Sequence, residues 1–115
     1  MRRGDIVWIN FDPATGAESN KRRPAVIVSN DGANRQAEQL RRGVLTVVPV
    51  TTNTKKVYPF QVVLPARRCN LTRASKAQAE QIRSVSVERF GKTIGRVPPD
   101  LMDGIDAAIR LHLAL

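Results

Sequence analysis

Cysteine and histidine are almost absent from this sequence of 115 residues, which contains one of each, Cys69 and His112. A single cysteine excludes an intramolecular disulfide, and the pair cannot supply the four nitrogen and sulfur ligands of a conventional zinc site. The scarcity of cysteine is typical of a reducing compartment, so we expect a cytoplasmic protein. The arginines around Cys69 favour a lowered thiol pKa, but an incidental loop or core cysteine is the simpler interpretation.

Long apolar runs are also missing. The first apolar stretch, residues 6–9, is followed at once by Asn10 and Asp12. It is too short for an export signal, and no other stretch approaches the length of a membrane span. We therefore expect no membrane partner.

Acidic residues are few: 10 Asp and Glu stand against 19 Lys and Arg, which gives a formal net charge of +9. Residues 98–115 carry a net −2, so the first 97 residues carry +11. Arginine presents a planar fork of donors that suits phosphate oxygens. The charge balance predicts a polyanionic partner, and nucleic acid is favoured.

Conventional catalytic motifs are absent as well. The sequence has no glycine loop for phosphate, no metalloprotease helix, no nucleophile elbow and no aspartate cluster for a two-metal nuclease. A nuclease built on this chain would therefore act without a metal or another cofactor. RNA allows this, because each 2′-hydroxyl is a nucleophile placed beside its own phosphorus, whereas DNA lacks that group.

What is present indicates one domain, mainly β. The hydrophobic share of 42% against 25% charged residues is ordinary for a globular protein. We expect polar loops at 12–23 and 51–56 and an irregular basic segment at 65–74. Residues 75–87 allow a strand or a helix, and the sheet context favours a strand. The remaining expected elements are strands at 5–11, 25–29, 44–50, 58–64 and 94–97, and a helix at 33–42.

The last segment has the pattern of an amphipathic helix. Pro98 and Pro99 suit a first turn, and apolar residues then recur at three- and four-residue spacing. This helix is expected to pack on a sheet or barrel. His112 falls on its apolar face, where a packed or half-exposed side chain is favoured over a catalytic base.

Six short motifs occur in one order along nearly the whole chain. They are Gly4-Asp5-Ile6-Val7-Trp8, Asp12-Pro13 with Gly16-x-Glu18, Arg23-Pro24 with the apolar run to Ser29, Val48-Pro49-Val50-Thr51-Thr52, Tyr58-Pro59-Phe60-x-Val62-Val63-Leu64, and Ala79-Glu80-Gln81-Ile82-Arg83-Ser84. Together they resemble the MazF/PemK family of toxin endoribonucleases from bacterial type II toxin–antitoxin pairs.

The resemblance implies an SH3-like barrel of the CcdB/PemK type with flanking helices and a C-terminal helix. It also implies a homodimer that cleaves single-stranded RNA (mRNA, or else rRNA or tRNA) at short sequences without a metal, and so inhibits translation and growth. The expected protein partner is a cognate antitoxin with an acidic, disordered tail, which binds DNA together with the toxin. Such a tail would compensate the positive charge of this chain.

The resemblance also implies site residues. The arginine of the Arg-Pro motif is Arg23, and the threonine that closes the third strand is Thr51; both are expected to be catalytic. Since a guanidinium keeps its proton at neutral pH, Arg23 is assigned to charge stabilisation, and Glu18 is the tentative general base. The residues expected to bind RNA are Lys21, Arg22, Thr52, Lys56, Gln81 and Arg83. Lys21 and Arg22 depart from the smaller or neutral residues expected before the catalytic arginine, which affects the target sequence more than the activity.

Three alternatives stay open. Glu18 is equally well explained as a surface carboxylate paired with Lys21 or Arg22. Among the few aromatic residues, Trp8 and Phe60 favour the core, whereas Tyr58 is undecided between the core and base stacking. At the level of function, the same barrel is compatible with a non-enzymatic toxin similar to the CcdB family, which binds DNA gyrase, or with a barrel that only binds RNA.

Overall fold

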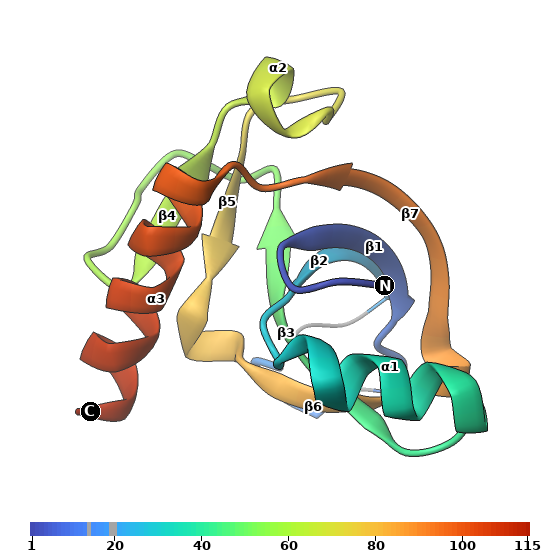
Figure 1. The fold of residues 1–115 in the computed structure, drawn as a ribbon. Coiled ribbons are helices and arrows are strands. Elements are labelled where there is room, and N and C mark those ends of the chain that lie inside the picture. Colours follow the sequence, from blue (N-terminus) through green and yellow to red (C-terminus); the bar gives the residue numbers. More distant parts are fainter. Residues whose placement is uncertain (14, 19–20) are drawn as a thin grey trace.

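The computed structural model describes residues 1–13, 15–18 and 21–115, which form one curved antiparallel sheet with helices at its margins (Figure 1). The strand order is β4-β5-β3-β2-β1-β7, and β6 pairs with β3. The strands are β1 (Asp5–Asn10), β2 (Arg22–Ile27), β3 (Val44–Thr51), β4 (Gln61–Leu64), β5 (Ser75–Gln78), β6 (Arg83–Ser86) and β7 (Phe90–Arg96). The helices are α1 (Asp31–Leu40), α2 (Ala66–Cys69) and α3 (Pro99–Leu113), with 3₁₀ turns at Ala79–Gln81 (η1) and Val87–Arg89 (η2).

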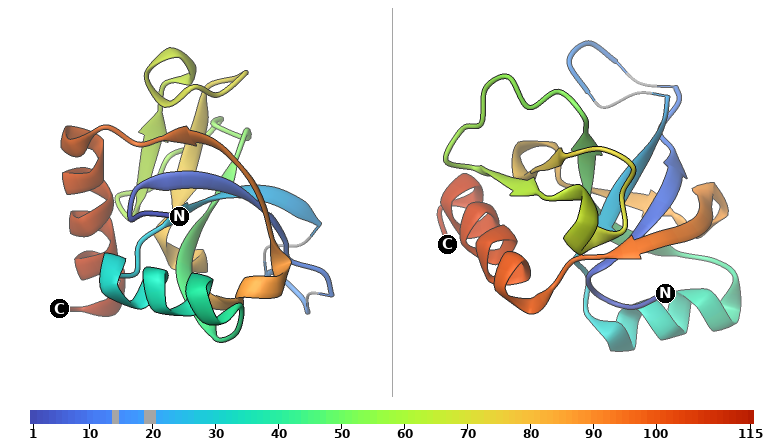
Figure 2. Two further views of the ribbon diagram at one scale, coloured as in Figure 1. Left: turned by 45° about the vertical axis from the view of Figure 1, so that its right-hand side comes forward. Right: turned by 90° about the horizontal axis from the view of Figure 1, so that it is seen from above.

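The central strands β1, β2 and β3 are buried on both faces. Alternate residues enter two separate cores, so that Val26 contributes to one and Ile27 to the other. The first core includes Met102 and Ile105 of α3, and the second includes Ala37 of α1. Figure 2 shows the two helices on different sides of the sheet. Burial on both faces explains why these strands have continuous apolar runs rather than a period of two.

The second strand begins at Arg22, two residues before Pro24, whereas the sequence pattern placed its start at residue 25. Arg22 pairs with Asn10 and Arg23 pairs with Ile9, so both arginines belong to β2 and not to the preceding loop. Lys21 adopts a positive φ of 62° just before the strand, and its backbone N–H donates to Asp12 Oδ1 at 2.7 Å. The expected loop 12–23 is therefore shorter, because backbone pairing with β1 extends the strand.

Several other boundaries differ from the predicted ones. The strand expected at 58–64 begins only at Gln61, because Gln61 N–H closes a turn onto the Tyr58 carbonyl at 2.9 Å. The basic segment 65–74 contains the short helix α2. The segment 75–87 forms strands as expected, but η1 interrupts it, and β7 begins before residue 94. The first helix begins at Asp31, because Asn30 Oδ1 caps it by accepting from Ala33 N–H at 2.8 Å.

Helix α3 packs closely on β4. Gly104 faces the Val62 methyl groups, where an added Cβ would lie 3.6 Å from Cγ1, and this small residue lets the helix approach the strand. His112 is exposed near the helix end, 6.4 Å from the Phe60 ring. Cys69 is buried, and this burial raises the pKa of its thiol despite the neighbouring Arg68. In the part of the chain that the structure describes, no helix is long and apolar enough to cross a membrane.

Candidate functional site

Arg23 and Thr51 meet at one end of the central strands. The β2–β3 ladder ends with Ala25 paired to Pro49, and Arg23 and Thr51 each lie two residues beyond that pair. Both residues line a pocket of about 290 Å³. The other residues that line it are Trp8, Lys21, Arg22, Pro24, Val50, Thr52 and Ser75.

Two further pockets adjoin this one. Thr51 and Thr52 also line a pocket of about 470 Å³, together with Asn53, Thr54, Lys55 and Arg73. Arg22 is shared with a pocket of about 550 Å³ next to β7. The three pockets therefore follow one another across the end of the sheet, with Arg23 and Thr51 in the middle.

The first two pockets are cationic. Of the described residues that line them, five are basic and none is acidic: Lys21, Arg22, Arg23, Lys55 and Arg73. Phosphate oxygens are the ligands that such a surface attracts, and an extended anion can contact several of these groups at once. The groove is thus suited to the backbone of a single nucleic acid strand.

The geometry around Thr51 leaves its hydroxyl proton available. Thr51 Oγ1 accepts a hydrogen bond from Asn53 N–H at 3.3 Å, and a hydroxyl that accepts can still donate its own proton to a ligand. Arg23 is half-buried at the floor of the same pocket. A permanent cation and a hydroxyl donor therefore face one cavity, which suits a phosphoryl group that gains negative charge.

Glu18, Gln81 and Arg83 form a separate cluster. Arg83 Nη1 lies 3.9 Å from Glu18 Oε2, and Gln81 Nε2 donates to the Ala17 carbonyl at 3.1 Å. None of the three lines the pocket of Arg23. The structure therefore pairs Glu18 with Arg83 instead of with Lys21 or Arg22, and it does not bring this tentative base to Arg23.

Lys56 belongs to a third group, beyond the groove. Its ammonium lies 4.8 Å from the centroid of the Tyr58 ring, which stacks on Phe60 with centroids 5.4 Å apart. The Lys56 carbonyl accepts from Lys76 Nζ at 2.6 Å. Tyr58 is exposed and Phe60 is half-buried, so the expectation that Phe60 lies in the core holds only in part.

The pocket also includes Trp8, which was expected in the core, and Ser75, which the sequence did not single out. Trp8 is half-buried instead of a core residue, and the Arg22 guanidinium lies 5.9 Å from the centroid of its ring. Trp8 pairs with Pro24, and Asn10, two residues further along β1 on the same face, pairs with Arg22. The polar and exposed Asn10 on the face of Trp8 was the available signal. Ser75 carried no such signal, because only the fold brings β5 to this edge.

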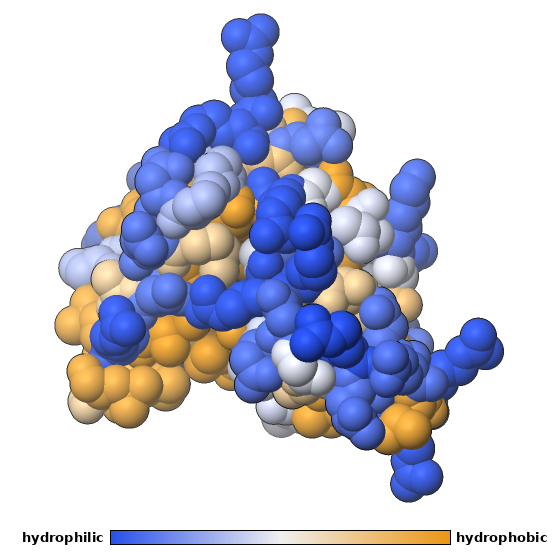
Figure 3. Space-filling model, viewed as in Figure 1, coloured by the Kyte–Doolittle hydropathy of each residue, from blue (hydrophilic) through white to orange (hydrophobic). Residues whose placement is uncertain are grey.

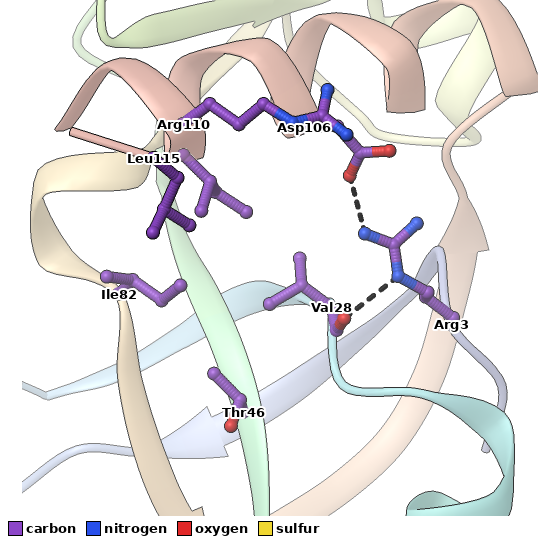
Figure 4. A pocket seen from close by; sticks show the side chains of 8 residues that line it. Arg3, Val28, Thr46, Ile82, Asp106, Arg110 and Leu115 are labelled. Atoms are coloured by element: carbon purple, nitrogen blue, oxygen red, sulfur yellow. Dashed lines mark hydrogen bonds and ion pairs between the residues drawn. The ribbon is translucent and has the colours of Figure 1, made fainter. Parts of the chain in front are cut away.

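A pocket of about 320 Å³ lies elsewhere, between α3 and the sheet (Figure 4). The Arg3 guanidinium spans it, with Nη2 2.5 Å from Asp106 Oδ1 and Nε donating to the Val28 carbonyl at 2.9 Å. Its apolar side is formed by Val28, Ile82, Ile109 and Leu115. None of the candidate site residues lines this pocket.

The described part of the chain has no cluster of carboxylate, imidazole and thiol groups that could hold a metal ion. Among residues 1–13, 15–18 and 21–115, no three of His, Cys, Asp and Glu lie close enough together to hold a metal ion. The chemistry that the described groove offers is that of guanidinium, ammonium and hydroxyl groups.

Comparisons with known proteins agree with this arrangement. The model of the family described as PemK-like, MazF-like toxin of type II toxin–antitoxin system matches residues 2–113. The chain is 56% identical to endoribonuclease MazF9 of Mycobacterium tuberculosis, covering 100% of this chain and 98% of that protein. It is 36% identical to the endoribonuclease toxin MazF of Escherichia coli K12, over 94% of this chain and 89% of the relative.

Solved structures give the same result for the fold. The crystal structure of MazF (Form-I) from Deinococcus radiodurans matches with a TM-score of 0.84 and 28% identity, covering 100% of this chain and 97% of the other. The resemblance and the predicted fold class, mainly β with a C-terminal helix, are both confirmed. Since the family model spans all but three residues, the chain belongs to the family of PemK-like, MazF-like toxins of type II toxin–antitoxin systems.

Proposed function

We propose that the groove centred on Arg23 and Thr51 is the active site of an endoribonuclease toxin that cleaves single-stranded RNA without a metal. The observation that supports this most directly is that these two residues line the same cationic pocket. Glu18 takes the proton of the substrate's 2′-hydroxyl, whose oxygen attacks the adjacent phosphorus, and the bond to the 5′-oxygen breaks as that oxygen takes up a proton from solvent. This step gives a 5′-hydroxyl fragment and a 2′,3′-cyclic phosphate, and later attack of water on the cyclic phosphate gives a 3′-phosphate end.

Arg23 and Thr51 stabilise the charge that develops during this step. The planar guanidinium of Arg23 contacts two oxygens of the pentacoordinate phosphorus, and the hydroxyl of Thr51 donates to a third. Arg23 does not act as the base, because a guanidinium keeps its proton at neutral pH. Glu18 is the proposed base, and it reaches the substrate only after leaving Arg83, 3.9 Å away.

RNA binding is assigned to two sets of residues. Lys21, Arg22 and Thr52 line the groove and contact phosphates beside the cut. Lys56, Gln81 and Arg83 lie outside the three adjoining pockets and contact the strand at a greater distance from Arg23. These flanking side chains contact the RNA around the cut and so determine which bases are preferred there.

Cleavage of RNA by the purified protein should continue at full rate in excess EDTA. The reason is that the described site stabilises phosphoryl charge with Arg23 and Thr51, and no three of the described His, Cys, Asp and Glu residues gather to hold a metal. The measurement is cleavage of a long mixed-sequence RNA with and without chelator, followed by chemical identification of the new ends. Loss of activity on chelation that magnesium restores would contradict the proposal.

The same experiment tests the alternatives. A barrel that only binds RNA leaves the RNA intact, and so does a toxin that acts on gyrase.

The cationic groove also supports the proposed antitoxin partner, because an acidic disordered tail would occupy the same phosphate positions. A relative from Deinococcus radiodurans, 26% identical over 100% of this chain, has been solved as a MazE-MazF complex. We also propose a cytoplasmic location, which is where the proposed RNA substrate is found.

We also propose a homodimer formed through the end of α3. Figure 3 shows hydrophobic surface over this end of the helix. Leu111, Leu113 and Leu115 are 58%, 47% and 82% exposed, and Leu115 also lines the partly apolar pocket of Figure 4. An apolar patch of this kind on a small domain marks an interface.

Leu111→Glu should convert the dimer to a monomer, because it places a charge in the apolar interface. The matched control is Leu40→Glu, since Leu40 is 56% exposed at the end of α1 and carries the same change away from α3. Light scattering after size-exclusion chromatography measures the mass of each protein. A monomeric wild type, or equal effects of the two substitutions, would refute this interface.

A further inference from the structure

The pocket beside β7 continues the candidate active site beyond Arg22. It has a volume of about 550 Å³ and is lined by Asn10, Asp12, Arg22, Glu88, Arg89, Phe90 and Gly91. Of the described residues, Arg22 alone lines both this pocket and the one with Arg23 and Thr51. A strand that follows the groove in this direction therefore passes the Arg22 guanidinium and then reaches the second cavity.

A bulge in β7 shapes the boundary between the two pockets. Val7 pairs with Thr93 and Ile9 pairs with Phe90, so two residues of β7, Gly91 and Lys92, lie opposite the single residue Trp8. A Cβ on Gly91 would stand 3.3 Å from Arg22 Nη2 and 3.3 Å from the Trp8 carbonyl oxygen. The missing side chain thus leaves room for the guanidinium to lie beside the Trp8 ring.

Most of the charged groups in this pocket are already engaged. Arg89 Nη1 donates to the Asn10 carbonyl at 3.1 Å and to the Asp12 carbonyl, and Asp12 Oδ1 accepts from Lys21 N–H at 2.7 Å. Glu88 differs. Its side chain is exposed, and within residues 1–13, 15–18 and 21–115 it makes no hydrogen bond or ion pair.

We infer that this pocket binds one base of the RNA beyond the cut and that Glu88 selects bases with an exocyclic amino group over uracil. The inference rests on the proposed ribonuclease function. Adenine, cytosine and guanine each present an amino donor, and a carboxylate is its natural acceptor. Uracil presents no amino group.

The charges favour a base in this pocket and a phosphate at its edge. The carboxylates of Asp12 and Glu88 repel a phosphate, whereas Arg22 stands at the boundary where the linking phosphodiester must pass. Phe90 lies at the start of β7 and adds an apolar surface for the base. The pocket beside β7 therefore recognises a base, while cleavage takes place in the pocket of Arg23 and Thr51.

Sequencing of cut sites tests this assignment. One long mixed-sequence RNA is cleaved briefly by the wild type, and base frequencies are counted at each position on both sides of the cuts. The wild type should disfavour uracil at one position separated from the scissile bond by at least one nucleotide. Glu88→Gln should reduce that discrimination about fivefold, the lower end of the effect of a base-edge contact. Gly91→Val, whose side chain would displace the Arg22 guanidinium at the edge of the pocket, should abolish it.

Asp103→Asn is the matched control. It removes the same charge from an exposed carboxylate of α3 that does not line the pocket of Glu88. Its base frequencies should equal those of the wild type. An unchanged profile for Glu88→Gln, or an equal change at every position, overturns the inference. A wild type that leaves the RNA intact refutes the proposed function instead, so the two failures are distinguishable.

Discussion

Arg23→Ala should lower the rate of RNA cleavage by at least about 100-fold, the usual scale for the loss of a preorganised charge donor. The melting temperature should stay near that of the wild type, because Arg23 lies at the open end of β2, beyond the buried core residues. Single-turnover rates on one RNA and a thermal melt measure the two effects. The matched control is Arg35→Ala, which removes the same side chain from the exposed face of α1 and should cleave at the wild-type rate.

Arg23→Lys separates geometry from charge. Lysine keeps the positive charge but lacks the planar fork that contacts two phosphoryl oxygens together, so it should not rescue the rate. Thr51→Ala should cost less than Arg23→Ala, since only a neutral donor is lost. Full activity of Arg23→Lys would mean that Arg23 supplies only background potential. Full activity of Arg23→Ala would remove the assignment of this pocket as the active site.

Replacement of the 2′-hydroxyl at the cleavage position by hydrogen should abolish cutting. The substituted strand has no internal nucleophile, while every phosphate that contacts the groove is retained. Binding should therefore stay within a few-fold of that of the unmodified RNA. Gel analysis of the products and a fluorescence titration measure cleavage and affinity on the same oligonucleotide.

The control substrate carries the deoxy substitution one nucleotide away from the cut. It should be cleaved, because its reacting hydroxyl is intact. If the first substrate were cut as fast as the unmodified RNA, the nucleophile would be water. In that event the proposed chemistry would be wrong, although the groove would still bind RNA.

Local patterns were sufficient to predict most elements of this fold. The run at 44–50 lies in a strand, as its β-branched residues predict, and Pro98 and Pro99 precede or begin the last helix. Both preferences affect the backbone conformation of only a few neighbouring residues, so the sequence alone reveals them. The family resemblance supplied the architecture, which a short strand pattern alone does not specify. Pairing between strands decided the rest: Arg22 and Arg23 belong to β2 because β1 offers them partners.

The candidate site was predictable where it follows the chain and less so where it depends on the fold. Arg23 and Thr51 came from motifs, and the structure places both in one pocket. The position of Trp8 depends on Pro24 beside it and on the bulge in β7, which single-residue preferences do not encode. The catalytic role of Glu18 stays a prediction, since the structure pairs this residue with Arg83.

Because both faces of β1, β2 and β3 are buried, stability and RNA recognition depend on different residues of this small chain. Substitutions inside either core change stability, because each buried aliphatic side chain contributes about 1.5–3 kcal/mol. The polar residues at the strand ends, such as Arg22 and Thr52, lie outside both cores. Substitutions there can alter the recognised RNA while the folding free energy stays above its threshold. A scaffold of this kind can acquire new targets without first acquiring extra stability.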